Sequence, residues 1–280
     1  MNAAFRIIVA EGEPVPVVFD SPHSGSIYPS DFDHRLDPML LRQAEDAHIE
    51  ELFAPVAVMG APLLHALFPR AYIDPNRDVL DIDVEMIEGD WPDPVEPTYK
   101  TLGRGAGLIW RQMRDHGYLY DRKLTVEEVR NRIKTCWRPY HDALADLINK
   151  AHARHGVSYH IDCHSMPARG DSSSEDGPVD RADFIVGDRD GTTCDPGFTT
   201  LIVDHLRTAG YDVAINDPYK GVELVKRYSD PFAGRHSVQL EVNRRLFMDE
   251  VTLAKTEDYL RMEQTIATLC QAIITYTKEK

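Results

Sequence analysis

The sequence predicts an α/β sandwich with a largely parallel sheet, and two observations support this. Short apolar runs rich in β-branched residues alternate with helical patterns of ten residues or more. Strands and helices that alternate in this way build a mostly parallel sheet with helices packed on it. The chain has 280 residues, of which 42% are hydrophobic, so it can bury a substantial core. We expect a single domain over residues 1–280.

Six segments are predicted to be strands: VPVVF (15–19), PLLHAL (62–67), VSYHIDC (157–163), ADFIVGD (182–188), YDVAIND (211–217) and HSVQLEV (236–242). Helices are predicted over 38–56, 125–154, 196–209 and 250–277. The second begins with a capping box, Thr125 with Glu128. In such sheets, sites form where loops leave the carboxyl ends of the strands.

The charge of the chain limits its partners. Acidic residues outnumber basic residues by 46 to 31, giving a net charge of −15, so nucleic acid and anionic membranes are not expected partners. No run reaches the ~18 apolar residues of a membrane span, and the first residues lack the layout of a signal peptide. The widely spaced cysteines indicate a reducing compartment, and we expect a cytoplasmic protein: Cys136, Cys163, Cys194 and Cys270.

Two of the twelve histidines stand out. His23 in DSPHSG and His164 in IDCHSM each follow a strand-like run, come after an aspartate and precede a serine. A strand end fixes the ring while the loop leaves it open to substrate. Each alone is equally consistent with a histidine hydrogen-bonded to the backbone, but two in one chain favour a metal or catalytic site.

A catalytic zinc site of this kind needs a third ligand, and a carboxylate suits it. The predicted helix 38–56 is acidic, with the segment AEDAHIEELF. Glu45 and Asp46 fall near the edge of its apolar stripe, whereas Glu51 points away from it. Periodicity does not choose between Glu45 and Asp46, and a solvated helix face explains the pattern as well.

The segment AYIDPNRD (71–78) places Asp74, Asn76 and Arg77 in a turn after a short strand-like piece. An arginine can grip a carboxylate with two hydrogen bonds, and a neighbouring asparagine can add a neutral one. An Asp–Arg pair that ties down the loop is the structural alternative.

A glutamate in a strand that otherwise looks buried is the strongest single anomaly. Alternation in HSVQLEV puts Val238 and Leu240 on one face and Gln239 and Glu241 on the other. A buried glutamate is commonly either paired with a cation or used as a general base. The same region carries Arg227.

An ordered set of motifs from about residue 15 to about residue 250 resembles the N-formylglutamate amidohydrolase family. The motifs are SPHSG with a trailing YP, DAHIEELF, YIDPNRD, GLIWR, WRPYH, IDCHS, GDRDGTTCDP, NDPYKG, KRYSDP and HSVQLEVNR. That family is similar to zinc carboxypeptidases. IDCHS resembles the strand that carries their last histidine ligand. The NR of YIDPNRD resembles their carboxylate-binding Asn-Arg pair, and QLEV resembles the strand of their catalytic glutamate.

The resemblance implies a three-layer α/β sandwich of the zinc-exopeptidase type, with a mixed, largely parallel sheet flanked by helices. It implies hydrolysis of N-formyl-L-glutamate to formate and glutamate in histidine degradation, with one Zn²⁺ or another divalent ion. By position, His23, Asp46 and His164 would bind the metal and Glu241 would be the base. Asn76 and Arg77 would hold the substrate's α-carboxylate, and Arg227 its side-chain carboxylate or the scissile carbonyl.

The chain departs from the pattern in places. Zinc carboxypeptidases carry H-x-x-E, but here Ser26 takes the place of that glutamate, so Glu45 or Glu50 remain alternatives to Asp46. Ala44 replaces the first acid of the D-x-D-W-H run of histidine-pathway deformylases, and GVELVKRYS differs from their GGY-I-T-R-H-Y-G segment. The acyl group and the amino acid are therefore open, and another N-acyl amino acid or a carboxypeptidase-like amide is the alternative substrate.

Two other classes of function fit the sequence less well. A non-haem iron oxygenase uses two histidines and one carboxylate, but it would favour H-x-D on a jelly roll, whereas this chain has D-x-H and long helices. A non-catalytic binding protein would have no need to keep His23, His164 and Glu241 together.

Overall fold

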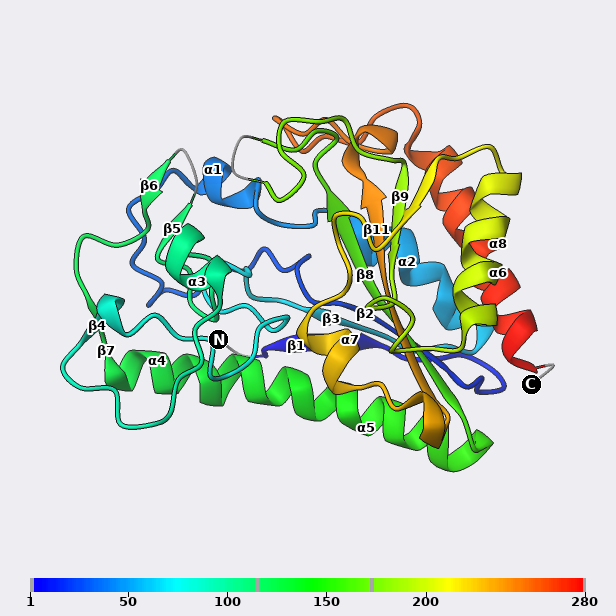
Figure 1. Ribbon diagram of the computed structural model, residues 1–280, viewed down its shortest axis with the longest axis horizontal. Helices are drawn as coiled ribbons and strands as arrows, with labels where there is room; N and C mark the ends of the chain where they lie inside the picture. The colour runs from blue at the N-terminus through cyan, green and yellow to red at the C-terminus, as the bar shows by residue number, and fades with distance from the viewer. Residues whose placement is uncertain (1–2, 114–115, 172–173, 279–280) are drawn as a thin grey trace. The chain divides into compact units, whose positions relative to one another are not determined.

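The computed structural model describes residues 3–113, 116–171 and 174–278. Its largest sheet has seven strands in the order β1-β3-β2-β8-β11-β9-β10 (Figure 1). These strands are β1 (Phe5–Ile8), β2 (Val17–Ser21), β3 (Leu63–Ala66), β8 (Ser158–Met166), β9 (Phe184–Gly187), β10 (Val213–Ile215) and β11 (Arg235–Asn243). Two further pairs are β4 (Ile87–Glu88) with β7 (Leu124–Thr125) and β5 (Gln112–Met113) with β6 (Gly117–Tyr118).

The direction of the strands confirms the predicted mixed, largely parallel sheet. Strand β8 is parallel to both β2 and β11, and β9 is parallel to β10. The pairing of β11 with β9 is antiparallel. All six predicted strands are present, and β8 and β11 are longer than the apolar runs that predicted them.

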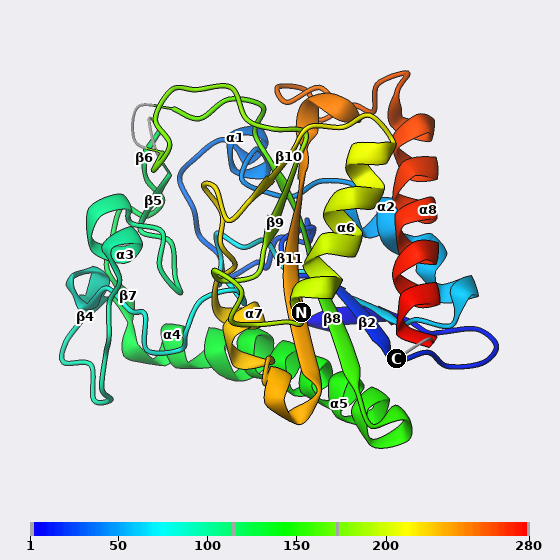
Figure 2. The same cartoon turned by 45° about the vertical axis from the view of Figure 1, so that its right-hand side comes forward.

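Helices flank the sheet. The helices of the described residues are α1 (Pro38–Arg42), α2 (Ile49–Phe53), α3 (Tyr99–Arg104), α4 (Val126–Arg132), α5 (Arg138–His155), α6 (Pro196–Thr208), α7 (Glu223–Arg227) and α8 (Tyr259–Lys278). Figure 2 shows α6 and α8 packed side by side along one side of the strands, with α2 beside them and α7 on the other side. The predicted capping box at Thr125 and Glu128 begins α4, which continues through a π-helix (Ile133–Trp137) into α5.

The chain forms two compact units. The first contains Met1–Arg6, Pro22–Glu45 and His65–Ala143, and the second Ile7–Ser21, Asp46–Leu64 and Leu144–Lys280. The first unit carries α1, α3, α4 and the two small sheets, and the second carries the central strands with α2, α6, α7 and α8. One catalytic domain over 1–280 stays a prediction.

One face of the central strands forms the apolar core of the second unit. Phe19, Ile161 and Leu240 are fully buried in one cluster with apolar residues of α2, α6 and α8. Burying such side chains contributes roughly 1.5–3 kcal/mol each. Because successive strand residues point to opposite faces, the alternate residues of the same strands lie on the other face, and these are mostly polar.

Two predicted helices differ from the structure. The segment 38–56 is not one helix, because the chain leaves helical geometry between α1 and α2 and His48 adopts a left-handed φ of 69°. The segment 250–258 is not helical either, because the Asp249 carboxylate accepts backbone hydrogen bonds from Val251 and Thr252 in a turn, and α8 begins at Tyr259. Within the described residues, no helix has both the length and the hydrophobicity that a membrane crossing requires.

Candidate metal centre and active site

The polar face of β2, β8 and β11 is buried. Strand register places Asp20 and Gln239 on either side of Asp162, and Glu241 opposite His164. A buried polar group is costly unless it is paired, so this face must be a hydrogen-bonded network. Its buried residues are Asp20, His160, Asp162, His164, Ser237, Gln239 and Glu241.

His164 lies within β8, two residues before its end, and both ring nitrogens meet carboxylates. Nε2 lies 2.8 Å from Oδ1 of Asp162, and Nδ1 lies 2.9 Å from Oδ2 of Asp46. Burial alone would lower the pKa of His164, but the charge and hydrogen bond of Asp162, the hydrogen bond of Asp46 and the charge of Glu241 raise it well above its usual range. The ring is thus fixed by acids on two sides.

His23 follows β2 by two residues and is held in a similar way. Its Nε2 lies 2.7 Å from Oδ1 of Asp74, which also accepts the backbone N–H of Asn76 at 2.9 Å. Burial would raise the pKa of Asp74, but the charges of His23 and Arg70 hold it well below its usual range. An ionised carboxylate only accepts hydrogen bonds, so Nε2 of His23 carries the proton that it donates.

His23, Asp46 and His164 form a buried cluster that could hold a metal ion. One ligand atom from each residue lies within 4.8 Å of the other two. Two histidines and a carboxylate are a donor set used by catalytic zinc sites. Metal-binding histidines almost always place their second nitrogen against a carboxylate or carbonyl. Here Nε2 of His23 lies against Asp74, and Nε2 of His164 lies against Asp162.

Asp46, rather than Glu45 or Glu50, is the acid in this cluster. Asp46 is fully buried at the break between α1 and α2, where its carbonyl accepts the N–H of Ile49 at the start of α2. Glu45 is buried too, but its carboxylate bonds Tyr28 at 2.7 Å and Arg42 at 3.2 Å. The two neighbouring acids therefore have different partners at the break between α1 and α2.

Glu241 is only 6% exposed, as the strand pattern indicated. Its Oε1 accepts a hydrogen bond of 2.8 Å from the amide of Gln239. Its register opposite His164 and its part in raising the pKa of that residue place a carboxylate beside a member of the cluster.

Asn76 and Arg77 are buried in the turn that follows Asp74. The N–H of Arg77 bonds the carbonyl of Asp74 at 3.2 Å. Burial lowers the pKa of Arg77, and the Asp74 carboxylate opposes that shift. Asp74 therefore links this turn to His23.

Two residues of the WRPYH motif hold the same turn. The indole N–H of Trp137 donates to the carbonyl of Arg77 at 3.0 Å, and Nε2 of His141 lies 2.8 Å from the carbonyl of Pro75. The two rings stack with centroids 3.8 Å apart. The sequence alone predicts no role for this motif, and the π-helix that precedes α5 marks it locally.

Arg227 lies in the last turn of α7 and pairs with Glu223, whose Oε1 is 2.5 Å from the guanidinium. The Arg227 side chain is 36% exposed. Its assignment to a substrate carboxylate stays a prediction.

Sequence reasoning missed Asp162 and a chain of side chains across the central strands. Oδ1 of Asp20 lies 2.8 Å from Nε2 of His160, whose Nδ1 lies 2.7 Å from the hydroxyl of Ser237. An Asp–His–Ser series of contacts is also found in serine hydrolases. Here all three side chains are fully buried, so the contacts serve to tie three strands together. The i, i+2 spacing of His160, Asp162 and His164 was the available signal.

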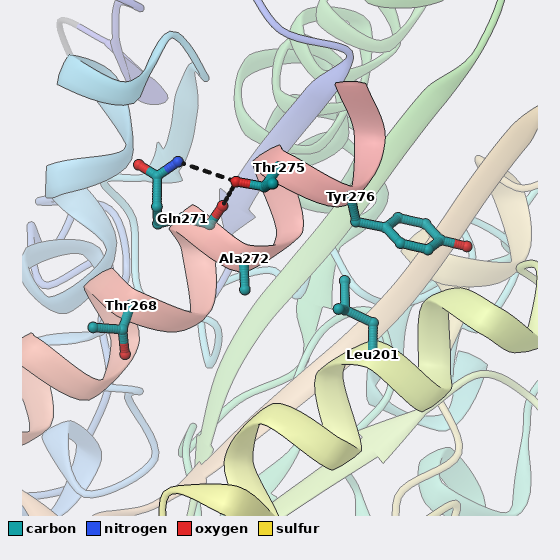
Figure 3. Close-up of a pocket in the computed structure, with 6 residues that line it drawn as sticks. All are labelled: Leu201, Thr268, Gln271, Ala272, Thr275 and Tyr276. Atoms are coloured by element: carbon teal, nitrogen blue, oxygen red, sulfur yellow. Dashed lines mark hydrogen bonds between the residues drawn. The ribbon is translucent and has the colours of Figure 1, made fainter. Parts of the chain in front are cut away.

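A surface hollow lies between α6 and α8 (Figure 3). Gln271 and Thr275 bond each other along its rim. None of its named lining residues is a predicted site residue: Leu201, Thr268, Gln271, Ala272, Thr275 and Tyr276.

One known protein family matches most of the chain. The sequence profile described as N-formylglutamate amidohydrolase matches residues 15–248. The chain belongs to the N-formylglutamate amidohydrolase family. A crystal structure of N-formylglutamate amidohydrolase from Ralstonia eutropha JMP134 is 44% identical, covers 99% of both chains and superposes with a TM-score of 0.94.

Two curated relatives are also similar to this chain. The N-formylglutamate deformylase of Pseudomonas putida is 26% identical over 272 residues, 95% of each chain. That of Pseudomonas aeruginosa is 27% identical over 245 residues, 84% of this chain and 83% of the relative. The match thus extends over most of both chains.

Proposed function

We propose that this enzyme hydrolyses the amide bond of N-formyl-L-glutamate to give formate and L-glutamate. The observation that carries the proposal is the buried cluster of His23, Asp46 and His164, with Glu241 opposite His164 in the sheet. Membership of the N-formylglutamate amidohydrolase family, and the names of its relatives, select the substrate.

The cluster suits one zinc ion or another divalent ion. Nitrogen and oxygen donors are present, all three residues are buried, and Asp74 and Asp162 occupy one nitrogen of each histidine ring. On this assignment, Nδ1 of His23, Nδ1 of His164 and Oδ2 of Asp46 are the ligand atoms. A divalent ion held there supplies a Lewis acid for the amide carbonyl and makes water more acidic.

Glu241 acts as the general base. Its carboxylate takes a proton from the attacking water and delivers it to the leaving amine of glutamate. Gln239 holds one oxygen of Glu241, which fixes the direction of the carboxylate. Fixed geometry of this kind supports catalysis because no reorganisation is needed during the reaction.

Basic side chains select a substrate with two carboxylates. Asn76 and Arg77 bind the α-carboxylate. The turn that carries them is held by Asp74 and by the hydrogen bonds of Trp137 and His141 to its carbonyl groups. Arg227 binds the side-chain carboxylate or the scissile carbonyl. Cationic groups in a chain with a net charge of −15 offset its long-range repulsion of an anionic substrate.

We further propose that the reaction belongs to histidine breakdown in the cytoplasm. The four cysteines are free buried thiols, which fits a reducing compartment. Two relatives are named N-formylglutamate deformylase, and the family resemblance implies that this activity serves histidine degradation.

A substrate panel tests the proposed function. N-formyl-L-glutamate, N-formyl-L-glutamine, N-acetyl-L-glutamate and a C-terminal glutamyl peptide are assayed by amine release. The expected result is the highest kcat/KM for N-formyl-L-glutamate, with a large loss for the glutamine analogue, which lacks the second carboxylate. Preference for the acetyl compound would indicate a different deacylase, and preference for the peptide a carboxypeptidase-like enzyme.

A further inference from the structure

Arg244 contacts the acid of the cluster, although neither its position nor its motif suggested a role. It follows β11 at the start of a short 3-10 helix (Arg244–Leu246), and its side chain is buried. Its Nη2 donates to Oδ1 of Asp46 at 3.1 Å, and its Nε donates to the hydroxyl of Ser165 at 3.0 Å. That hydroxyl donates to the same Oδ1 at 3.3 Å.

The two oxygens of Asp46 therefore have different neighbours. Oδ1 accepts hydrogen bonds from Arg244 and Ser165, whereas Oδ2 lies 2.9 Å from Nδ1 of His164. A guanidinium and a hydroxyl on Oδ1 make that oxygen a poor metal ligand, because its lone pairs are directed at N–H and O–H groups. If Arg244 served only as the partner of a buried charge, its hydrogen bonds and those of Ser165 would not need to fall on the same oxygen of Asp46.

We propose that Arg244 is a positioning residue that holds Asp46 as a one-oxygen ligand and thereby sets the affinity and the coordination number of the metal. The inference rests on the proposed function, because it takes the cluster to be a metal site. A carboxylate bound through one oxygen leaves a coordination position open, as catalytic zinc sites require. Residues outside the ligand set commonly control metal affinity in this way.

Metal binding by purified full-length variants tests the inference without any assay of activity. Arg244→Met removes the clamp, Arg244→Lys keeps one charged donor, and Arg245→Met is the matched control, since Arg245 is exposed and pairs with Asp183 at 2.7 Å. The zinc dissociation constant is measured by competition with a chromophoric chelator. We expect Arg244→Met to weaken zinc binding about 10- to 100-fold, Arg244→Lys to recover part of the loss, and Arg245→Met to match the unmodified protein.

The visible absorption of bound Co²⁺ gives a second readout, which would not change if the role of Arg244 were only structural. Released from its clamp, Asp46 can bind through both oxygens, which raises the coordination number and lowers the visible absorption of bound Co²⁺. We expect that loss in Arg244→Met and its partial recovery in Arg244→Lys. A zinc affinity within twofold of the unmodified protein, or tighter, with an unchanged cobalt spectrum overturns the inference.

Two further variants separate the possible failures. Where thermal unfolding shows that Arg244→Met does not fold, Ser165→Ala and Arg244→Lys decide, and normal zinc affinity in both overturns the inference. Asp46→Asn tests the site itself. If Asp46→Asn leaves zinc binding intact, or if the unmodified protein binds no metal, the metal site of the proposed function fails as well. If Asp46→Asn weakens binding and Arg244→Met does not, only the role of Arg244 is lost.

Discussion

Nε2 of His23 donates a hydrogen bond of 2.7 Å to Oδ1 of Asp74, a residue 51 positions further along the chain. The same oxygen accepts the backbone N–H of Asn76. One buried carboxylate thus orients a proposed metal ligand and begins the turn proposed to bind the substrate. A change at Asp74 is expected to affect both.

Asp74→Asn is expected to weaken zinc binding about 10- to 100-fold, because a neutral amide orients the His23 ring less firmly and makes it a weaker donor. The measurement is chelator competition on the purified variant. Asp121→Asn is the control, since Asp121 is an exposed partner of Arg35. Unchanged zinc affinity in Asp74→Asn would show that His23 does not depend on Asp74 for metal binding.

Glu241→Gln is expected to lower kcat about 10²- to 10⁴-fold, the range typical of losing a general base, with the metal content unchanged. Glutamine keeps the size of the side chain and an oxygen that can accept the hydrogen bond from Gln239. Turnover and bound zinc are measured on the same sample, with the exposed Glu257→Gln as the control. Retained kcat would remove Glu241 as the base.

Arg77→Ala is expected to raise KM for N-formyl-L-glutamate about 10- to 100-fold, the effect of losing a charged hydrogen bond to the α-carboxylate. The α-amide analogue lacks that carboxylate, so its KM is expected to change little. The exposed Arg35→Ala is the control for general charge effects. An equal loss with both substrates would contradict direct binding of the α-carboxylate.

His236 is expected to make the free energy of unfolding depend on pH. Burial lowers the pKa of His236 from its usual 6.5, and the nearby Asp195 opposes the shift. The unfolded chain therefore takes up the proton first as the pH falls. Stability is fully present above pH 6.5 and is lost as the pH falls towards and through the lowered pKa of the folded state.

His236→Asn removes this titration while keeping an acceptor near the position of Nδ1, which accepts the backbone N–H of Asp195 at 3.1 Å. Urea unfolding at pH 7 and pH 5 measures the effect. We expect a smaller difference in the free energy of unfolding between the two pH values in the variant than in the unmodified protein. Equal differences would show that His236 is not one of the groups responsible.

The central sheet and the position of two histidines at its strand ends could be predicted from the sequence for a physical reason. Apolar alternation marks buried strands, and parallel strands bring their carboxyl ends to one edge. His23 and His164 were therefore expected to lie close together, and they do. The buried position of Glu241 was also predicted, because alternation in its strand is unambiguous.

The acid proposed as the third metal ligand could not be selected from the sequence pattern. Periodicity treated 38–56 as one helix, but the left-handed backbone at His48 and the contacts of Asp46 with His164 and Arg244 redirect that carboxylate. These contacts join residues more than a hundred positions apart. Local sequence carries no trace of such long-range pairs, and the family resemblance was what favoured Asp46.

Removal and return of metal tests the central claim most directly, namely that His23, Asp46 and His164 hold a metal used to hydrolyse N-formyl-L-glutamate. Formate release is measured on chelator-treated protein and after zinc is added back, together with the zinc bound per chain. The expected result is loss of activity on chelation, recovery with one zinc per chain, and no recovery in His164→Ala. Full activity in protein shown to be free of metal would contradict the account.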